Sequence, residues 1–120
     1  YADLAEIYST DKEYEVGTVM AIGGDAETTE YDKTKSVFGV ISEKPGFLMN
    51  KDAEGQAIAF VGRVPVKVKG AVSKGDKVFA DDGGVATTTK KGELVGFALA
   101  TDTNESTKLV EVALRLINNS

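Results

Sequence analysis

Three serine–lysine neighbours are the residues of this sequence best suited to acyl-transfer chemistry. They are Lys35-Ser36, Ser42 with Lys44, and Ser73-Lys74. A serine beside a lysine acts as a nucleophile when the lysine is buried and its positive charge is suppressed. All three neighbours stand in charged stretches with turn-forming residues, where a lysine stays solvated. We therefore predict no catalytic residue among them.

Carboxylates offer two further kinds of chemistry. Asp3, Glu6 and Asp11 lie near the first residue and could assist a self-cleavage reaction beside an upstream segment, but carboxylates also suit the first turn of a helix. Asp81-Asp82-Gly83-Gly84 could offer oxygen ligands to a hard cation, yet it lacks the spaced carboxylates of a calcium loop and favours a hairpin turn. No metal ion or other cofactor is predicted.

The composition narrows the function classes. The 120 residues contain no cysteine and no histidine, which removes the usual zinc ligands and the usual general base near neutral pH. The formal net charge is −5 and the lysines are spread along the chain, so nucleic-acid binding is not expected. No apolar run approaches the roughly 18 residues of a membrane span, so membrane insertion is not expected. We predict a protein that is not an enzyme.

Alternating apolar residues predict that β-strands position these groups. One strand is expected from Ile58 to Val68 and another from Leu109 to Leu116, and glycine-rich turn signals separate further short β-branched runs. Only the first residues fit a helix, because Tyr1, Leu4, Ala5 and Tyr8 follow the i, i+3, i+4, i+7 spacing.

An internal repeat organises the predicted strands. Gly17 aligns with Gly75 and Gly39 with Gly96, and each half ends in one of the alternating strands. We predict an all-β fold, a small barrel or two-sheet sandwich of about eight short strands built from two similar halves, with a short N-terminal helical segment. Residues 1–12 are expected to join a stem, since Tyr1 is interpreted as the start of a fragment, and 13–117 to form one β domain with halves 13–69 and 70–117.

The stretch "KPGFLMNK" is the most apolar connection in the chain. Pro45 to Asn50 has the length by which the first half exceeds the second, so it looks like an insertion in one copy of the repeated unit. Phe47, Leu48 and Met49 either fold back to plug one end of a barrel or form a contact with another subunit, because exposed apolar patches mark interaction surfaces.

The segments "YADLAEIYSTDKEYEVGTVMAIGG", "VFGVISEKPGFLMN" and "GRVPVKVKGAVSKGDKVF" resemble the C-terminal domain of tail-fibre and related structural proteins of tailed bacteriophages. The resemblance covers Tyr1 to about Leu116 and is most specific at Tyr1 to Glu6, Pro45 to Asn50 and Gly62 to Val68. It implies a virion location, a homotrimer, contacts with other virion proteins and a host surface receptor. The expected subunit interface comprises Phe47, Leu48, Met49, Tyr1, Leu4 and Tyr8.

Two more distant likenesses supply the alternatives. Ala2 to Glu6 and Gly39 to Pro45 are similar to the autocleaving chaperone domains of phage appendages, although Lys44 stands where asparagine is usual. The second half, "GDKVFADDGGVATTTKKGELVGFALA", resembles small capsid-decoration proteins, which also form trimers. No enzyme site is carried over from any of these families, so a structural domain is the leading hypothesis and an autoproteolytic chaperone or a decoration protein the alternative.

Overall fold

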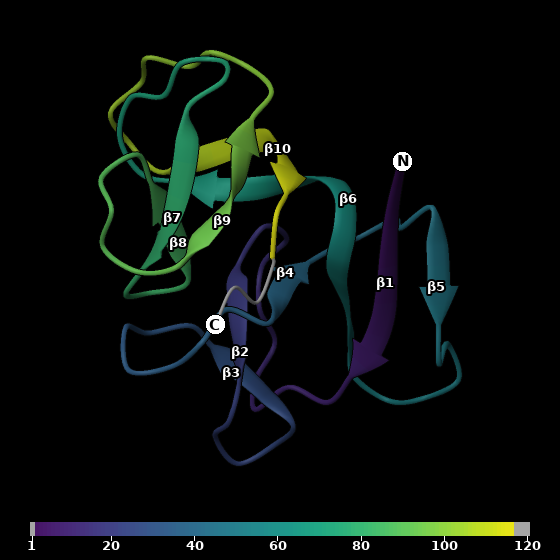
Figure 1. Cartoon of the computed structure of the whole chain (residues 1–120). Coiled ribbons are helices and arrows are strands. Elements are labelled where there is room, and N and C mark those ends of the chain that lie inside the picture. Colours follow the sequence, from purple (N-terminus) through teal and green to yellow (C-terminus); the bar gives the residue numbers. More distant parts are fainter. Residues whose placement is uncertain (1, 117–120) are drawn as a thin grey trace.

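Ten β-strands carry the regular structure of residues 2–116, the part of the chain that the computed structural model describes (Figure 1). In chain order they are β1 (Ala2–Tyr8), β2 (Val19–Ile22), β3 (Thr28–Glu30), β4 (Gly39–Ile41), β5 (Phe47–Met49), β6 (Gln56–Val68), β7 (Lys77–Asp81), β8 (Val85–Thr87), β9 (Leu94–Ala98) and β10 (Lys108–Leu114). All ten belong to one hydrogen-bonded sheet. The prediction of an all-β fold is therefore confirmed.

Five of the strands close into a small barrel. Around the ring, β6 pairs with β10, β10 with β9, β9 with β7, β7 with β8, and β8 again with β6. Side chains from alternate residues fill the interior, as in other small barrels. They include Val64, Val66, Val68, Val78 and Val95, each at most 1% exposed. The alternation that predicted a strand from Ile58 to Val68 thus builds one wall of the barrel.

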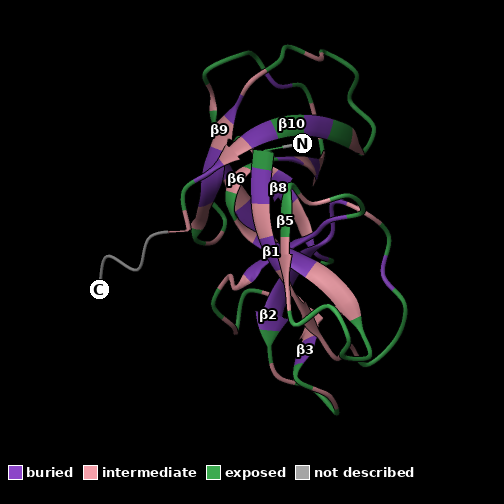
Figure 2. Cartoon of the chain, turned by 90° about the vertical axis from the view of Figure 1, so that its right-hand side faces the viewer, coloured by how far each residue is buried: buried purple, intermediate pink, exposed green. Residues whose placement is uncertain are grey.

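β6 connects the barrel to the remaining strands. Its second half faces β10, whereas its first half pairs with β1 and with β4. Beyond β4 the sheet continues through β2 to β3, and beyond β1 it continues to β5. β1 and β5 lie on the right in Figure 1, away from the barrel strands β7 to β9. In Figure 2 most of the buried residues lie in strands, whereas most residues of the connections are exposed or half-buried.

The strand order repeats in the two parts of the chain that the glycines align. β3, β2, β4 and β6 are neighbours in that order, and β8, β7, β9 and β10 are neighbours in the corresponding order. The amide of Gly17 donates to the carbonyl of Ile41 at 2.9 Å, and the amide of Gly75 donates to that of Ala98 at 2.8 Å. Both glycines have a positive φ, 88° and 93°, which glycine adopts without strain. The aligned glycines therefore occupy equivalent places in two similar four-strand units.

β5 departs from this repeat. It lies between β4 and β6 in the chain, inside the predicted insertion from Pro45 to Asn50, and no described strand stands between β9 and β10. Together with β1 it raises the number of strands from the predicted eight or so to ten.

The predicted N-terminal helix is wrong, because the described part of that segment is the strand β1. β1 is hydrogen-bonded on both sides, to β6 and to β5. Its buried residues are Asp3 and Ala5, two positions apart, which is the spacing of a strand. A helix of about eight residues has little stability of its own in water, so the two flanking ladders decide the conformation.

Candidate interaction surfaces

β5 forms an open edge of the sheet. It pairs only with β1, in parallel, with Leu4 opposite Phe47, Ala5 opposite Leu48 and Glu6 opposite Met49. The outer backbone groups of β5 therefore face no other strand of residues 2–116. An unpaired strand edge is a template for pairing with another chain.

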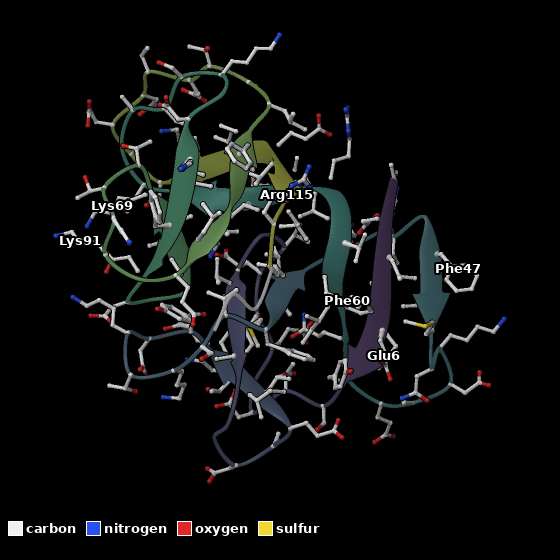
Figure 3. All side chains as sticks on the ribbon, in the orientation of Figure 1. Glu6, Phe47, Phe60, Lys69, Lys91 and Arg115 are labelled. Atoms are coloured by element: carbon white, nitrogen blue, oxygen red, sulfur yellow. The ribbon has the colours of Figure 1, made fainter. Side chains whose placement is uncertain are left out.

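A row of three apolar side chains crosses the sheet at this edge. Leu4 is the partner of Phe47 in β5 and of Val61 in β6, so the three project from the same face. Phe47 is 64% exposed, Val61 is 55% exposed and Leu4 is half-buried. We name Leu4, Phe47 and Val61 the edge row. In Figure 3 the labelled Phe47 projects outward beyond β5.

The other residues of the predicted interface lie in different surroundings. Leu48 is half-buried and packs against the main core, so it anchors β5 to the fold. Met49 is half-buried beside Glu6. Tyr8 packs edge-on against Phe38, with ring centroids 4.9 Å apart, and belongs to a separate small core. Tyr1 lies outside the described residues. Sequence reasoning missed Val61, which lies on the outward face of β6 with Arg63, opposite to the buried Val64.

The three N-terminal carboxylates are separated, and each accepts a hydrogen bond from a hydroxyl group. Asp3 is 5% exposed and accepts from Ser42 Oγ at 2.7 Å and from the Gly46 amide at 3.0 Å. Glu6 accepts from the hydroxyl of Tyr8, and this bond raises the pKa of Tyr8. Asp11 accepts from Tyr14, which lowers the pKa of Asp11. The fold thus places these carboxylates at three different points of the molecule.

The structure pairs none of the predicted serine–lysine neighbours. Ser42 bonds to Asp3, and Lys35 bonds to Asp32. Over residues 2–116, no group of three or more acidic side chains is placed to hold a metal ion. The same residues contain no helix that is long and apolar enough to cross a membrane.

A groove on the barrel has a floor that combines cationic and aromatic side chains. The floor is the outer face of the β7–β9 ladder, where Lys77 is opposite Phe97 and Phe79 is opposite Leu94. Phe79 and Phe97 are half-buried, while Val78, which precedes Phe79 in β7, is buried in the barrel interior. The groove has a volume of about 1190 Å³ and is partly open to solvent.

Two connections and the chain after β10 form the walls of the groove. Lys33 and Lys35 come from the β3–β4 connection, Lys90 and Lys91 from the β8–β9 connection, and Arg115 follows β10. The carboxylate of Glu93 accepts a 2.7 Å hydrogen bond from the Val37 amide, which ties the two connections together. Tyr31 is buried beneath them, and its burial raises the pKa of its hydroxyl.

We call this feature the basic groove. Its lining contains six cationic side chains, Lys33, Lys35, Lys77, Lys90, Lys91 and Arg115, and one carboxylate, Glu93. The lining thus has a formal charge of +5. Because the whole chain has a net charge of −5, the residues outside the lining carry −10. Sequence reasoning missed the groove because these cations are spread from residue 33 to residue 115 and only the fold gathers them. The pair Lys90-Lys91 was its one local signal.

The five-stranded barrel with a second strand group is similar in fold to solved structures of bacteriophage proteins, one of which is a head fibre. No protein-family model and no curated protein matches the sequence. The resemblance to phage virion structural proteins, expected from the sequence motifs, is confirmed as a shared fold.

Three such structures belong to bacteriophage phi29. The C-terminal fragment of gene product 12 has a TM-score of 0.70 and 14% identity, over 94% of this chain and 100% of that one. Pre-mature gene product 12 has a TM-score of 0.72 and 14% identity, and the match covers 95% of this chain and 21% of that longer one. The N base of the head fibre gp8.5 has a TM-score of 0.56 and 13% identity, over 93% of each chain.

Proposed function

We propose that this chain is a non-enzymatic structural domain of a phage virion, at the C-terminal end of a trimeric tail fibre or appendage. The observation that carries the proposal is the match over 94% of this chain with the whole C-terminal fragment of phi29 gene product 12. In this role residues 1–12 join the fibre stem, and the domain serves assembly and contact with the host surface.

The edge row is the proposed subunit interface. Its exposed apolar side chains lie next to the open edge of β5, so a neighbouring subunit could cover them and pair with that edge. Closed three-fold symmetry buries the same patch on every subunit. The rival explanation, a plug for one end of the barrel, is disfavoured because β5 pairs with β1, outside the ring of barrel strands. Leu48 packs against the core and anchors β5, which leaves Phe47 exposed.

Light scattering over a concentration series tests this proposal. The expected mass is about three times 12.7 kDa. Phe47→Ser should weaken the trimer by at least about tenfold, because a central aromatic residue commonly dominates an interface. Ile22→Ser is the matched control, since Ile22 is 56% exposed and belongs to β2, outside the edge row. A monomeric parent chain, or a Phe47→Ser trimer as stable as the parent, would remove the edge row from the interface.

A position on the phage head is a second candidate, favoured by the match with the head fibre gp8.5 over 93% of both chains. A capsid-decoration protein, the alternative named from the sequence, would also have this position on the head. Labelling virions with an antibody against this chain decides between the two positions, because electron micrographs distinguish label on heads from label on tails.

An autoproteolytic chaperone is a third candidate, favoured by the buried Asp3–Ser42 pair. A carboxylate that accepts a hydrogen bond from a serine hydroxyl is placed to take its proton. Expression of the natural polypeptide that contains this domain tests it. Self-cleavage that Ser42→Ala abolishes supports this role, and an intact polypeptide contradicts it.

A further inference from the structure

We propose that the basic groove binds an anionic oligosaccharide, a chain of sugars that carries carboxylate or phosphate groups. The chemistry of the groove lining determines this ligand class, which does not depend on the proposed virion role.

Cationic side chains without an ion-pair partner make the groove a site for anions. Within residues 2–116, no carboxylate lies within the 4.0 Å of an ion pair from the side-chain nitrogens of Lys77, Lys90, Lys91 or Arg115. Lys33 and Lys35 are paired, with Asp82 and Asp32. Four cations without an ion-pair partner outnumber the single carboxylate of the lining, Glu93, so the groove attracts an anion and repels a cation.

The cations come from both sides of the floor. In Figure 3 the labelled Lys91 and Arg115 lie on opposite sides of β7 and β9. A single small anion would reach only some of them, whereas a chain laid along the floor could meet several. The volume of about 1190 Å³ leaves room for an extended ligand.

The aromatic floor favours sugar rings between the charged groups. Phe79 and Phe97 are half-buried on the outer face of the barrel, where each offers apolar surface to a ligand lying on β7 and β9. The apolar face of a sugar ring can pack on such a surface while its acidic group meets a lysine. An acidic ligand without apolar parts would leave these rings uncovered.

The acidic remainder of the chain disfavours nucleic acid as the ligand. A nucleic acid carries closely spaced phosphates that would continue beyond the groove. There it would meet the rest of the molecule, which carries −10, including Asp32 and Asp82 beside the groove wall.

Titration calorimetry at low salt tests the proposal with four probes. They are hexagalacturonate, an acidic sugar chain; maltohexaose, a neutral one; tripolyphosphate, which has no sugar; and a single-stranded thymidine dodecamer. Hexagalacturonate should bind, and its affinity should fall as salt is added. Lys90→Ala with Lys91→Ala should weaken it at least about fivefold, because two exposed charges that meet the ligand are lost. Lys51→Ala with Lys74→Ala removes the same charge outside the groove and should change the affinity less than twofold.

A second variant isolates the sugar-binding part of the floor. Phe79→Leu keeps an apolar side chain but removes the aromatic face, so it should weaken hexagalacturonate and leave tripolyphosphate binding unchanged. Absence of hexagalacturonate binding, or equal losses in the two lysine double variants, would overturn the groove as the site. Equal affinity for maltohexaose would overturn the role of charge. Tighter binding of the thymidine dodecamer would overturn the carbohydrate assignment.

Discussion

Asp3 shows how one buried side chain holds the β5 edge of the sheet in place. Its carboxylate accepts hydrogen bonds from Ser42 and Gly46, which lie in the connection that leads from β4 into β5. Asp3→Ala would leave these two donors without their acceptor, so we expect a loss of roughly 1–3 kcal/mol in the free energy of unfolding. Urea denaturation measures it. Asp25→Ala, at an exposed turn, is the control, and equal midpoints for both variants would contradict the assigned role.

Asp32 predicts an acid dependence of stability. Hydrogen bonds from Lys35, and then from Thr34, hold the pKa of Asp32 at about 2, below its ordinary 3.8. Because the folded-state pKa is the lower one, the stabilisation is complete above the unfolded-state value and is lost as the pH falls from about 4 to about 2. Asp32→Asn should therefore lose less stability than the parent across this range in denaturant titrations. Equal losses would show that this carboxylate contributes nothing to acid unfolding.

Glycines set how closely the strands of the barrel approach each other. A Cβ atom at Gly96, in β9, would lie 2.1 Å from the carbonyl oxygen of Ala113 in β10. Gly96→Ala must separate the two strands, and we expect it to cost about 3 kcal/mol of unfolding free energy. Gly75→Ala is the matched control, since Gly75 has φ 93° but open space around it, and strain alone costs about 1 kcal/mol. Thermal unfolding of both variants compares the two effects, and similar melting temperatures would argue against close strand contact.

The two candidate surfaces lie on opposite sides of the molecule. In Figure 3 Phe47 stands at the outer edge of β5, whereas Lys91 stands at the far side of the barrel. One chain supplies the whole lining described for the basic groove, so ligand binding should not require the oligomer. We expect Phe47→Ser to change the mass in light scattering and to leave hexagalacturonate affinity per chain within about twofold. Lys90→Ala with Lys91→Ala should do the reverse. A loss of both properties in either variant would mean that the surfaces meet in the assembly.

Local patterns in the sequence were enough to predict the all-β class and the alternating strands, but not the strands β1 and β5. The alternation of Val64, Val66 and Val68 reports burial of one strand face, and Gly17 and Gly75 mark turns that need a positive φ. Both signals arise within a few neighbouring residues. The apolar stretch from Phe47 to Met49 was predicted only as an inserted connection; the fold makes it the strand β5 and separates the exposed Phe47 from the anchoring Leu48.

Tertiary structure alone decided the conformation of the N-terminus and the position of the basic groove. The segment from Ala2 to Tyr8 fits a helix by spacing, but β6 and β5 supply hydrogen-bonding partners from more than forty residues away and make it a strand. The groove cations belong to separate connections and strands, so their distance in space depends on how the barrel closes. Periodicity encodes which face of a segment is buried, whereas long-range pairing determines which segments become neighbours.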